Sequence, residues 1–301
     1  MRGKLTTVLL ASMLTFSLGA SGQTIRVVDG NTAGNDNSKQ EKAIDHVQYR
    51  ITYATKFVTD TTKRDSTGNY LYLDDEMRLD IGSAVGKFYS ARKAIYDKWM
   101  DEKIARRDMD FTNPPAHPSL SWILYRNYPA GETSFLTMAM MGYYRISEKT
   151  QTPDWSVGTD TCTLLGYRCT KAETSFKGRH WTVWFTEDIP LDFGPWKLMG
   201  LPGLILKAAD SQRQYVFEAK GLEQVGGKED ITLVKDYKKY EPVTQKQLDK
   251  INRTTTADDA LKAAGITISM DNVKMEGGSE KDDFLKSMKQ VSPYNPIEIV
   301  K

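Results

Sequence analysis

The middle of this sequence is a series of short runs in which apolar and polar residues alternate. Such alternation is typical of half-buried β-strands. Short connections rich in glycine and proline separate most of the runs, which leaves little room for crossover helices and favours an antiparallel meander over β-α-β units. The runs cover residues 46–60, 70–82, 86–90, 121–129, 133–149, 164–176, 179–190, 201–210, 214–225 and 230–243. We therefore predict an α+β fold that is mainly antiparallel β, with a curved open sheet or half-barrel.

In three segments the apolar residues or the capping residues follow a helical pattern. Residues 90–107 place Trp99, Met100 and Ile104 near one stripe among charged residues, which predicts an amphipathic central helix packed against the sheet. Residues 244–253 and 256–265 each begin with threonine, a good N-cap, and predict a helical C-terminal region.

The N-terminus has the composition of a secretory signal peptide. Arg2 and Lys4 precede an uncharged, largely apolar stretch, and small residues then lead to a plausible cleavage point before Gln23. The apolar stretch is short and rich in Thr and Ser, which disfavours a membrane anchor. We expect a signal peptide over 1–22, a flexible lead-in over 23–43 and a single β-rich domain over 44–301. The protein should be exported to the periplasm or cell envelope, and soluble, with no integral membrane segment after cleavage.

The charge balance argues against nucleic acid as a partner. The chain has 41 Lys and Arg against 39 Asp and Glu, and loss of Arg2 and Lys4 with the signal peptide leaves 39 of each sign. A nearly neutral chain with interleaved charges has no polybasic surface for a phosphate backbone.

Cys162 and Cys169 are the two cysteines of the chain. An exported protein meets an oxidising compartment, so a disulfide between them is the expected state. Six residues separate the two cysteines, and this spacing excludes a redox-active C-x-x-C motif.

Two neighbouring aromatic-rich segments carry the most unusual composition. In "HWTVWFTEDIP" aromatic residues lie on both faces of a predicted strand, which Pro190 ends because proline has no N–H to donate. In "GPWKLMGLPGLILKA" Pro202 stands at the start of the next strand, flanked by Gly200 and Gly203. Together they predict a wide corner between two strands.

These segments also carry a family resemblance. The hexapeptide "GLPGLI", together with "GYRCTKA", "GPWK" and the pattern F-x-G-R-x-W-x-x-W-F-T-x-D-I-P, resembles the GLPGLI family of exported proteins from Bacteroidota. The segments "MRLDIG" and "KFYS" are similar to the N-terminal half of that family. The resemblance implies an exported protein without an assigned activity, with a strand pattern similar to open half-barrel lipoprotein carriers.

Catalytic motifs are not evident in the sequence. His46, His117 and His180 are far apart, and H-E-x-x-H, G-x-S-x-G and phosphate-binding glycine loops are absent. Glu187 and Asp188 are the best acid–base candidates, but adjacent residues of a strand point to opposite faces. We therefore expect a protein that is not an enzyme, assign no catalytic residue, metal or cofactor, and keep a hydrolase of unknown class as an alternative.

The main functional expectation is non-catalytic binding of an apolar ligand, a lipid or a peptide in the half-barrel groove. Trp181, Phe185, Trp196, Leu201 and Leu204 would line this groove, or fill an ordinary core, with the 90–107 helix as a plug. A second alternative is a structural component docked on an outer-membrane protein, with Trp184 and Trp196 as surface anchors. The residues assigned to the groove or its motif are Trp181, Trp184, Phe185, Asp188, Pro190, Trp196, Gly200, Leu201, Pro202, Gly203, Leu204 and Ile205.

Overall fold

The computed structural model describes residues 41–263, 265, 283 and 286–300. The predicted signal peptide and residues 23–40 of the predicted lead-in lie outside the described residues. Among the described residues, no helix is long and apolar enough to cross a membrane.

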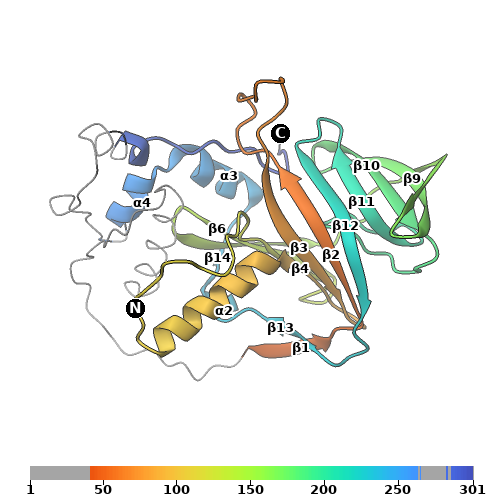
Figure 1. Cartoon of the computed structure of the whole chain (residues 1–301), viewed down its shortest axis with the longest axis horizontal. Helices are drawn as coiled ribbons and strands as arrows, with labels where there is room; N and C mark the ends of the chain where they lie inside the picture. The colour runs from red at the N-terminus through yellow and green to blue at the C-terminus, as the bar shows by residue number, and fades with distance from the viewer. Residues whose placement is uncertain (1–40, 264, 266–282, 284–285, 301) are drawn as a thin grey trace.

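One large sheet of twelve strands organises the chain (Figure 1). Its spatial order is β14-β7-β6-β5-β4-β3-β2-β12-β11-β10-β9-β8, and every neighbouring pair is antiparallel except β14 with β7. The strands are β2 Tyr49–Phe57, β3 Leu73–Ile81, β4 Gly86–Ser90, β5 Ile123–Arg126, β6 Glu132–Ala139, β7 Gly142–Lys149, β8 Ser156–Leu164, β9 Tyr167–Phe176, β10 Arg179–Thr186, β11 Leu204–Asp210, β12 Tyr215–Gln224 and β14 Glu241–Pro242. The predicted fold class, mainly antiparallel β with a curved open sheet, is confirmed.

Smaller elements flank the sheet. Strands β1 (Lys42–His46) and β13 (Asp230–Leu233) form a separate antiparallel pair, and a 3₁₀ turn η1 spans Tyr237–Lys239. Helices α2 (Ala91–Ala105), α3 (Gln245–Thr254) and α4 (Ala257–Ala263) lie to the left in Figure 1, whereas β9–β11 lie to the right. All three helices occur where the sequence predicts them.

Helix α2 packs on the sheet through few residues. It contacts β3 and β4, and only Ala91 and Met100 of the helix are buried. The Ser90 side chain caps its N-terminus by accepting a hydrogen bond from the backbone N–H of Lys93. The predicted central helix therefore lies against the sheet surface and does not fill a hollow as a plug.

Three stretches differ from the predicted runs. Residues 230–243, predicted as one run, divide into β13, the 3₁₀ turn η1 and β14, and β13 and β14 belong to different sheets. Residues 133–149, predicted as one run, form the hairpin β6–β7, because Met140 and Met141 adopt positive φ and reverse the chain. Strand β8 lies largely outside the predicted runs, since most of its residues are polar and exposed and show no alternation.

The corner between β10 and β11 explains the glycines and prolines around "GLPGLI". Backbone hydrogen bonds from Leu204 N to Ile189 O (3.0 Å) and from Ile205 N to Phe193 O (2.9 Å) hold the corner together. A Cβ at Gly203 would lie 2.0 Å from the carbonyl oxygen of Thr186, so this residue must be glycine for β11 to pass so close to β10.

Gly203→Ala should lower the free energy of unfolding by about 1–3 kcal/mol, because the added methyl meets backbone atoms that cannot move aside. Gly221→Ala is the matched control, since no atom lies within 4 Å of a Cβ at Gly221. Urea unfolding of both variants checks the prediction. Equal stability of the two variants would show that the corner is not tightly packed.

Candidate functional site

A cleft of about 190 Å³ lies between the sheet and the C-terminal part of the chain. One wall comes from the approach to β5 and from β6, with Trp122 and Phe135. Tyr215, at the start of β12, lies beside them, and α3 with residues 294–297 forms the opposite wall. The residues that meet here are spread along the chain from Phe57 to Ile297, so only the folded chain builds the cleft.

Four aromatic rings form a continuous column along the cleft. Phe57 stacks on Tyr215 with ring centroids 6.3 Å apart, and Tyr215 stacks on Trp122 at 6.1 Å. Phe135 meets Trp122 edge-on at 5.7 Å. Phe57, Tyr215 and Phe135 are buried and Trp122 is half-buried, so Trp122 is the ring of the column that remains open to the cleft.

Arg179 fixes the C-terminal wall of the cleft. Its buried guanidinium pairs with Asp210 at 2.9 Å and donates to the carbonyl oxygens of Pro296 (2.5 Å) and Ile297 (3.0 Å). The Tyr215 hydroxyl donates to the carbonyl oxygen of Asn295 at 2.5 Å. These bonds attach residues 295–297 to the sheet and hold the wall in place.

A charge cluster with two buried members, Lys197 and Glu298, and two half-buried members, Glu148 and Lys177, lies on the other side of Phe135 from the cleft. Lys197 contacts Glu148 at 2.6 Å and also contacts Glu298, while Lys177 contacts Glu148 at 2.6 Å. Lys197 Nζ is 5.9 Å from the ring centroid of Phe135, which separates the cluster from the cleft. The charges pair with one another, so their role here is to attach Glu298 and the C-terminal segment.

Glu148 should make this attachment sensitive to acid. Burial acts to raise the pKa of Glu148, but Lys197 and Lys177 outweigh it and hold the pKa below 4.5. The stabilisation is therefore fully present above pH 4.5 and is lost as the pH falls below that value. The stability difference between the parent protein and Glu148→Gln, measured by urea unfolding, should be largest near pH 6 and shrink toward pH 3. A difference that does not change with pH would contradict this assignment.

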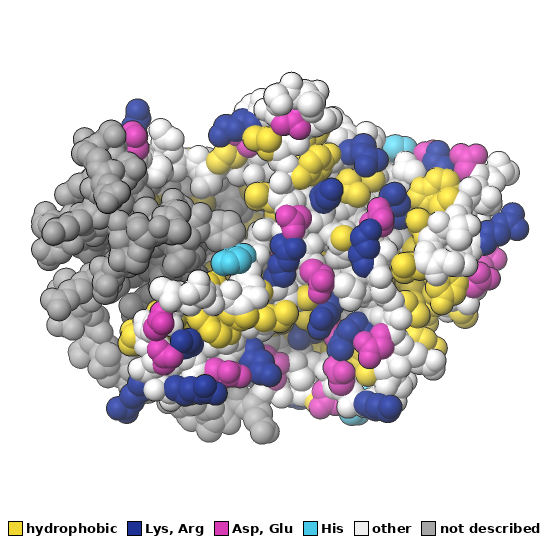
Figure 2. All heavy atoms as spheres, viewed as in Figure 1, with side chains coloured by type: hydrophobic (Ala, Val, Ile, Leu, Met, Phe, Trp, Pro, Cys, Tyr) yellow, Lys and Arg dark blue, Asp and Glu magenta, His cyan; other side chains and the backbone are white. Residues whose placement is uncertain are grey.

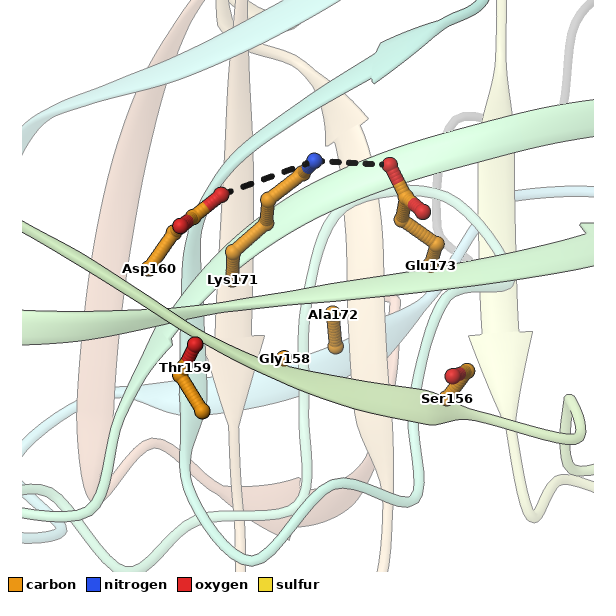
Figure 3. A pocket seen from close by; sticks show the side chains of 7 residues that line it. All are labelled: Ser156, Gly158, Thr159, Asp160, Lys171, Ala172 and Glu173. Carbon is orange, nitrogen blue, oxygen red and sulfur yellow. Dashed lines mark ion pairs between the residues drawn. The ribbon is translucent and has the colours of Figure 1, made fainter.

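A second cavity, of about 220 Å³, is open and lies where β8 and β9 lose regular register (Figure 3). Lys171 lies between Glu173, at 2.9 Å, and Asp160, at 3.9 Å. Exposed ion pairs of this kind contribute little to stability. Here the positive and negative side chains already pair with one another. This cavity offers less for recognition than the aromatic cleft.

The residues predicted from the sequence as a groove lie elsewhere. Trp181, Phe185, Trp196, Leu201, Leu204 and Ile205 are buried in the main hydrophobic core, as is the backbone of Gly203 beside them. Trp184 is half-buried, and Asp188, Pro190, Gly200 and Pro202 are exposed around the corner. None of the twelve lines the aromatic cleft.

The predicted acid–base candidates are not assembled into a site. Glu187 and Asp188 are exposed where β10 ends, whereas Arg179 and Lys197, which lie within ten residues of them in the sequence, pair with Asp210 and Glu148. Within the described ranges, no group of three or more His, Cys, Asp and Glu could hold a metal ion.

The predicted disulfide is wrong. Cys162 and Cys169 face each other across β8 and β9, but both thiols are free. The Cys169 sulfur lies 3.5 Å from the carbonyl oxygen of Tyr167 on its own strand. Burial raises the pKa of Cys169 to about 11, so this thiol is unreactive at neutral pH.

Charged side chains of both signs are interspersed over the face seen in Figure 2, without a large patch of one sign. The expectation that nucleic acid is not a partner stays a prediction.

Comparisons with known proteins find a family model that is similar to part of this chain. Residues 143–253, from β7 to α3, match the family described as N-glycanase peptide, N-terminal domain. The solved structures of PNGF-II in two space groups, P21 and C2, are 20% and 19% identical to the chain. Each comparison covers 67% of this chain and 32% of the other, with a TM-score of 0.40. The chain thus spans about a third of the length of those structures. No curated protein matches it.

The family match overturns the resemblance to the GLPGLI family. Within the hexapeptide, Gly203 meets a local requirement, since a Cβ there would collide with the backbone of Thr186 where β10 and β11 meet at this corner. The match also overturns the expected non-catalytic binding of an apolar ligand and the expectation that the protein is not an enzyme. Of the alternatives drawn from the sequence, a hydrolase agrees best with the match.

The cleft itself was not predicted from the sequence. Trp122, Tyr215 and the α3 residues Gln245 and Asn252 come from three separate segments, and each is an ordinary residue in its own segment. No spacing or motif connects them. The one local signal is Trp122, a tryptophan placed just before a strand whose inward positions are otherwise filled by Leu124 and its neighbours.

Proposed function

We propose that this protein takes part in the hydrolytic processing of N-linked glycans, as an N-glycanase-type enzyme or as a domain of one. The observation that carries the proposal is the match of residues 143–253 to the N-terminal domain of N-glycanases. The matched segment includes Tyr215, Gln245 and Asn252 of the aromatic cleft, so the family resemblance and the candidate site share residues.

Export of the protein would agree with such a role. The signal-peptide pattern of residues 1–22 supports export, so we propose that the protein acts on glycans in the periplasm or cell envelope. Docking on an outer-membrane protein stays a prediction.

The test is a release assay. The purified protein is incubated with a glycoprotein that carries neutral N-glycans, and mass spectrometry follows free glycan and the mass of the former glycosylation-site peptide. A heat-denatured sample is the control. In parallel, retention of the protein on the immobilised glycoprotein is compared with retention on the same glycoprotein after its N-glycans have been removed.

Glycan release, or retention that disappears with the glycans, is the expected result. Absence of release together with equal retention on both columns would overturn the proposed function.

A further inference from the structure

The aromatic cleft is suited to an uncharged ligand. No residue that lines it carries a formal charge, and its polar members are hydroxyl and amide side chains. A phosphate, a carboxylate or a metal ion would therefore lose its hydration without a charged partner, which is costly. These properties favour a ligand with neutral hydroxyl groups.

The half-buried Trp122 offers both a flat apolar surface and a hydrogen-bond donor. Its ring is the accessible member of the aromatic column that it forms with Tyr215 and Phe135. In the described part of the chain no group accepts a hydrogen bond from its indole N–H, and this atom is not among the buried unpaired ones. A ligand that lies on the ring can therefore also accept a hydrogen bond from it.

Two amide side chains of α3, Gln245 and Asn252, line the same space. Gln245 donates its amide to Asp249 at 2.8 Å, and Asn252 donates its amide to the carbonyl oxygen of Leu248 at 3.0 Å. Within the described residues, the carbonyl oxygens of both side chains have no donor of their own. They are available as acceptors for ligand hydroxyl groups.

The size of the cleft limits the ligand. Pockets for drug-sized ligands measure about 300–1,000 Å³, whereas this cleft measures about 190 Å³. A long acyl chain or an extended peptide would exceed it. A single pyranose ring, with one C–H face and several hydroxyl groups, matches the cleft in size and in chemistry.

We propose that the cleft binds one neutral pyranose residue of an N-glycan, stacked on Trp122 and held by hydroxyl contacts to Gln245 and Asn252. This inference rests on the proposed function for the identity of the glycan. The cleft is the contact site for the sugar, and the charge cluster behind Phe135 keeps its C-terminal wall in place.

Calorimetric titration with a free neutral N-glycan of mannose and N-acetylglucosamine tests the site. Trp122→Ala should raise the Kd about tenfold or more, because it removes the stacking surface. Trp184→Ala is the matched control, since Trp184 is also half-buried on the sheet but lies outside the cleft. It should leave the Kd within about twofold of the parent value. Thermal unfolding of each variant verifies that it is folded.

A second measurement does not depend on the stability of the alanine variant. In the parent protein, the indole N–H resonance of Trp122 is assigned by its loss in Trp122→Phe and followed by NMR as the glycan is added. A saturable shift of this resonance supports the proposal. Glycan binding without a shift of this resonance, or with an unchanged Kd in folded Trp122→Ala, would overturn the proposal that the cleft binds the sugar. The proposed function would still stand. Absence of glycan binding and of release by the parent would overturn both.

Discussion

Trp181→Ala should lower the free energy of unfolding by about 3–5 kcal/mol. Trp181 is fully buried on β10, and its ring packs 5.5 Å from the ring of Trp196 and 6.4 Å from that of Phe217. Its replacement leaves a large cavity between the corner and the neighbouring strands. Among the described residues nothing accepts a hydrogen bond from the indole N–H of Trp181, so the expected loss comes from packing.

Trp181→Phe is the informative companion variant. Because no hydrogen bond is lost, it should cost clearly less than the alanine variant, about half or below. Urea unfolding monitored by circular dichroism measures both. A loss below about 1 kcal/mol for Trp181→Ala would mean that this residue lies on a surface and not in the core.

Arg126→Leu should lower the free energy of unfolding by about 3 kcal/mol. This buried guanidinium donates to the carbonyl oxygens of Gly194 (2.5 Å), Trp196 (2.5 Å) and Leu198 (3.1 Å), and so holds the corner segment onto β5. Each carbonyl left without a donor costs about 1–3 kcal/mol. Relief of the buried charge offsets part of the loss, since burial lowers the pKa of Arg126 to about 10.

Arg168→Leu is the control for this effect, because Arg168 is exposed on β9. It should change the free energy of unfolding by less than about 0.5 kcal/mol. Equal stability of Arg126→Leu and the parent protein would contradict the role of Arg126 as the donor that organises the corner.

The local pattern of the sequence predicts the sheet well where one strand face is buried. Trp181, Val183 and Phe185 alternate with more accessible residues, and all three are buried as the period of two requires. The same argument fails for β8, whose residues are exposed on both faces and therefore carry no alternation. It also misses the β6–β7 turn, because Met140 and Met141 adopt positive φ without glycine or asparagine to indicate it.

The candidate site could not be predicted from the sequence, and the reason is physical. Its members meet through the pairing of β12 with β2, which places Tyr215 beside Phe57, and through attachment of the C-terminal segment by Arg179 and Tyr215. Aromatic residues near the "GLPGLI" corner drew the sequence-based predictions because they cluster along the chain. In the fold they pack inward, whereas Trp122, isolated in the sequence, lies at the cleft.

A crystal structure of the protein with a bound neutral N-glycan tests the central claim most directly. The account predicts density for one sugar ring stacked on Trp122, with hydroxyl groups within hydrogen-bond distance of Gln245 and Asn252. A glycan bound at another place, with the cleft filled only by water, would contradict it.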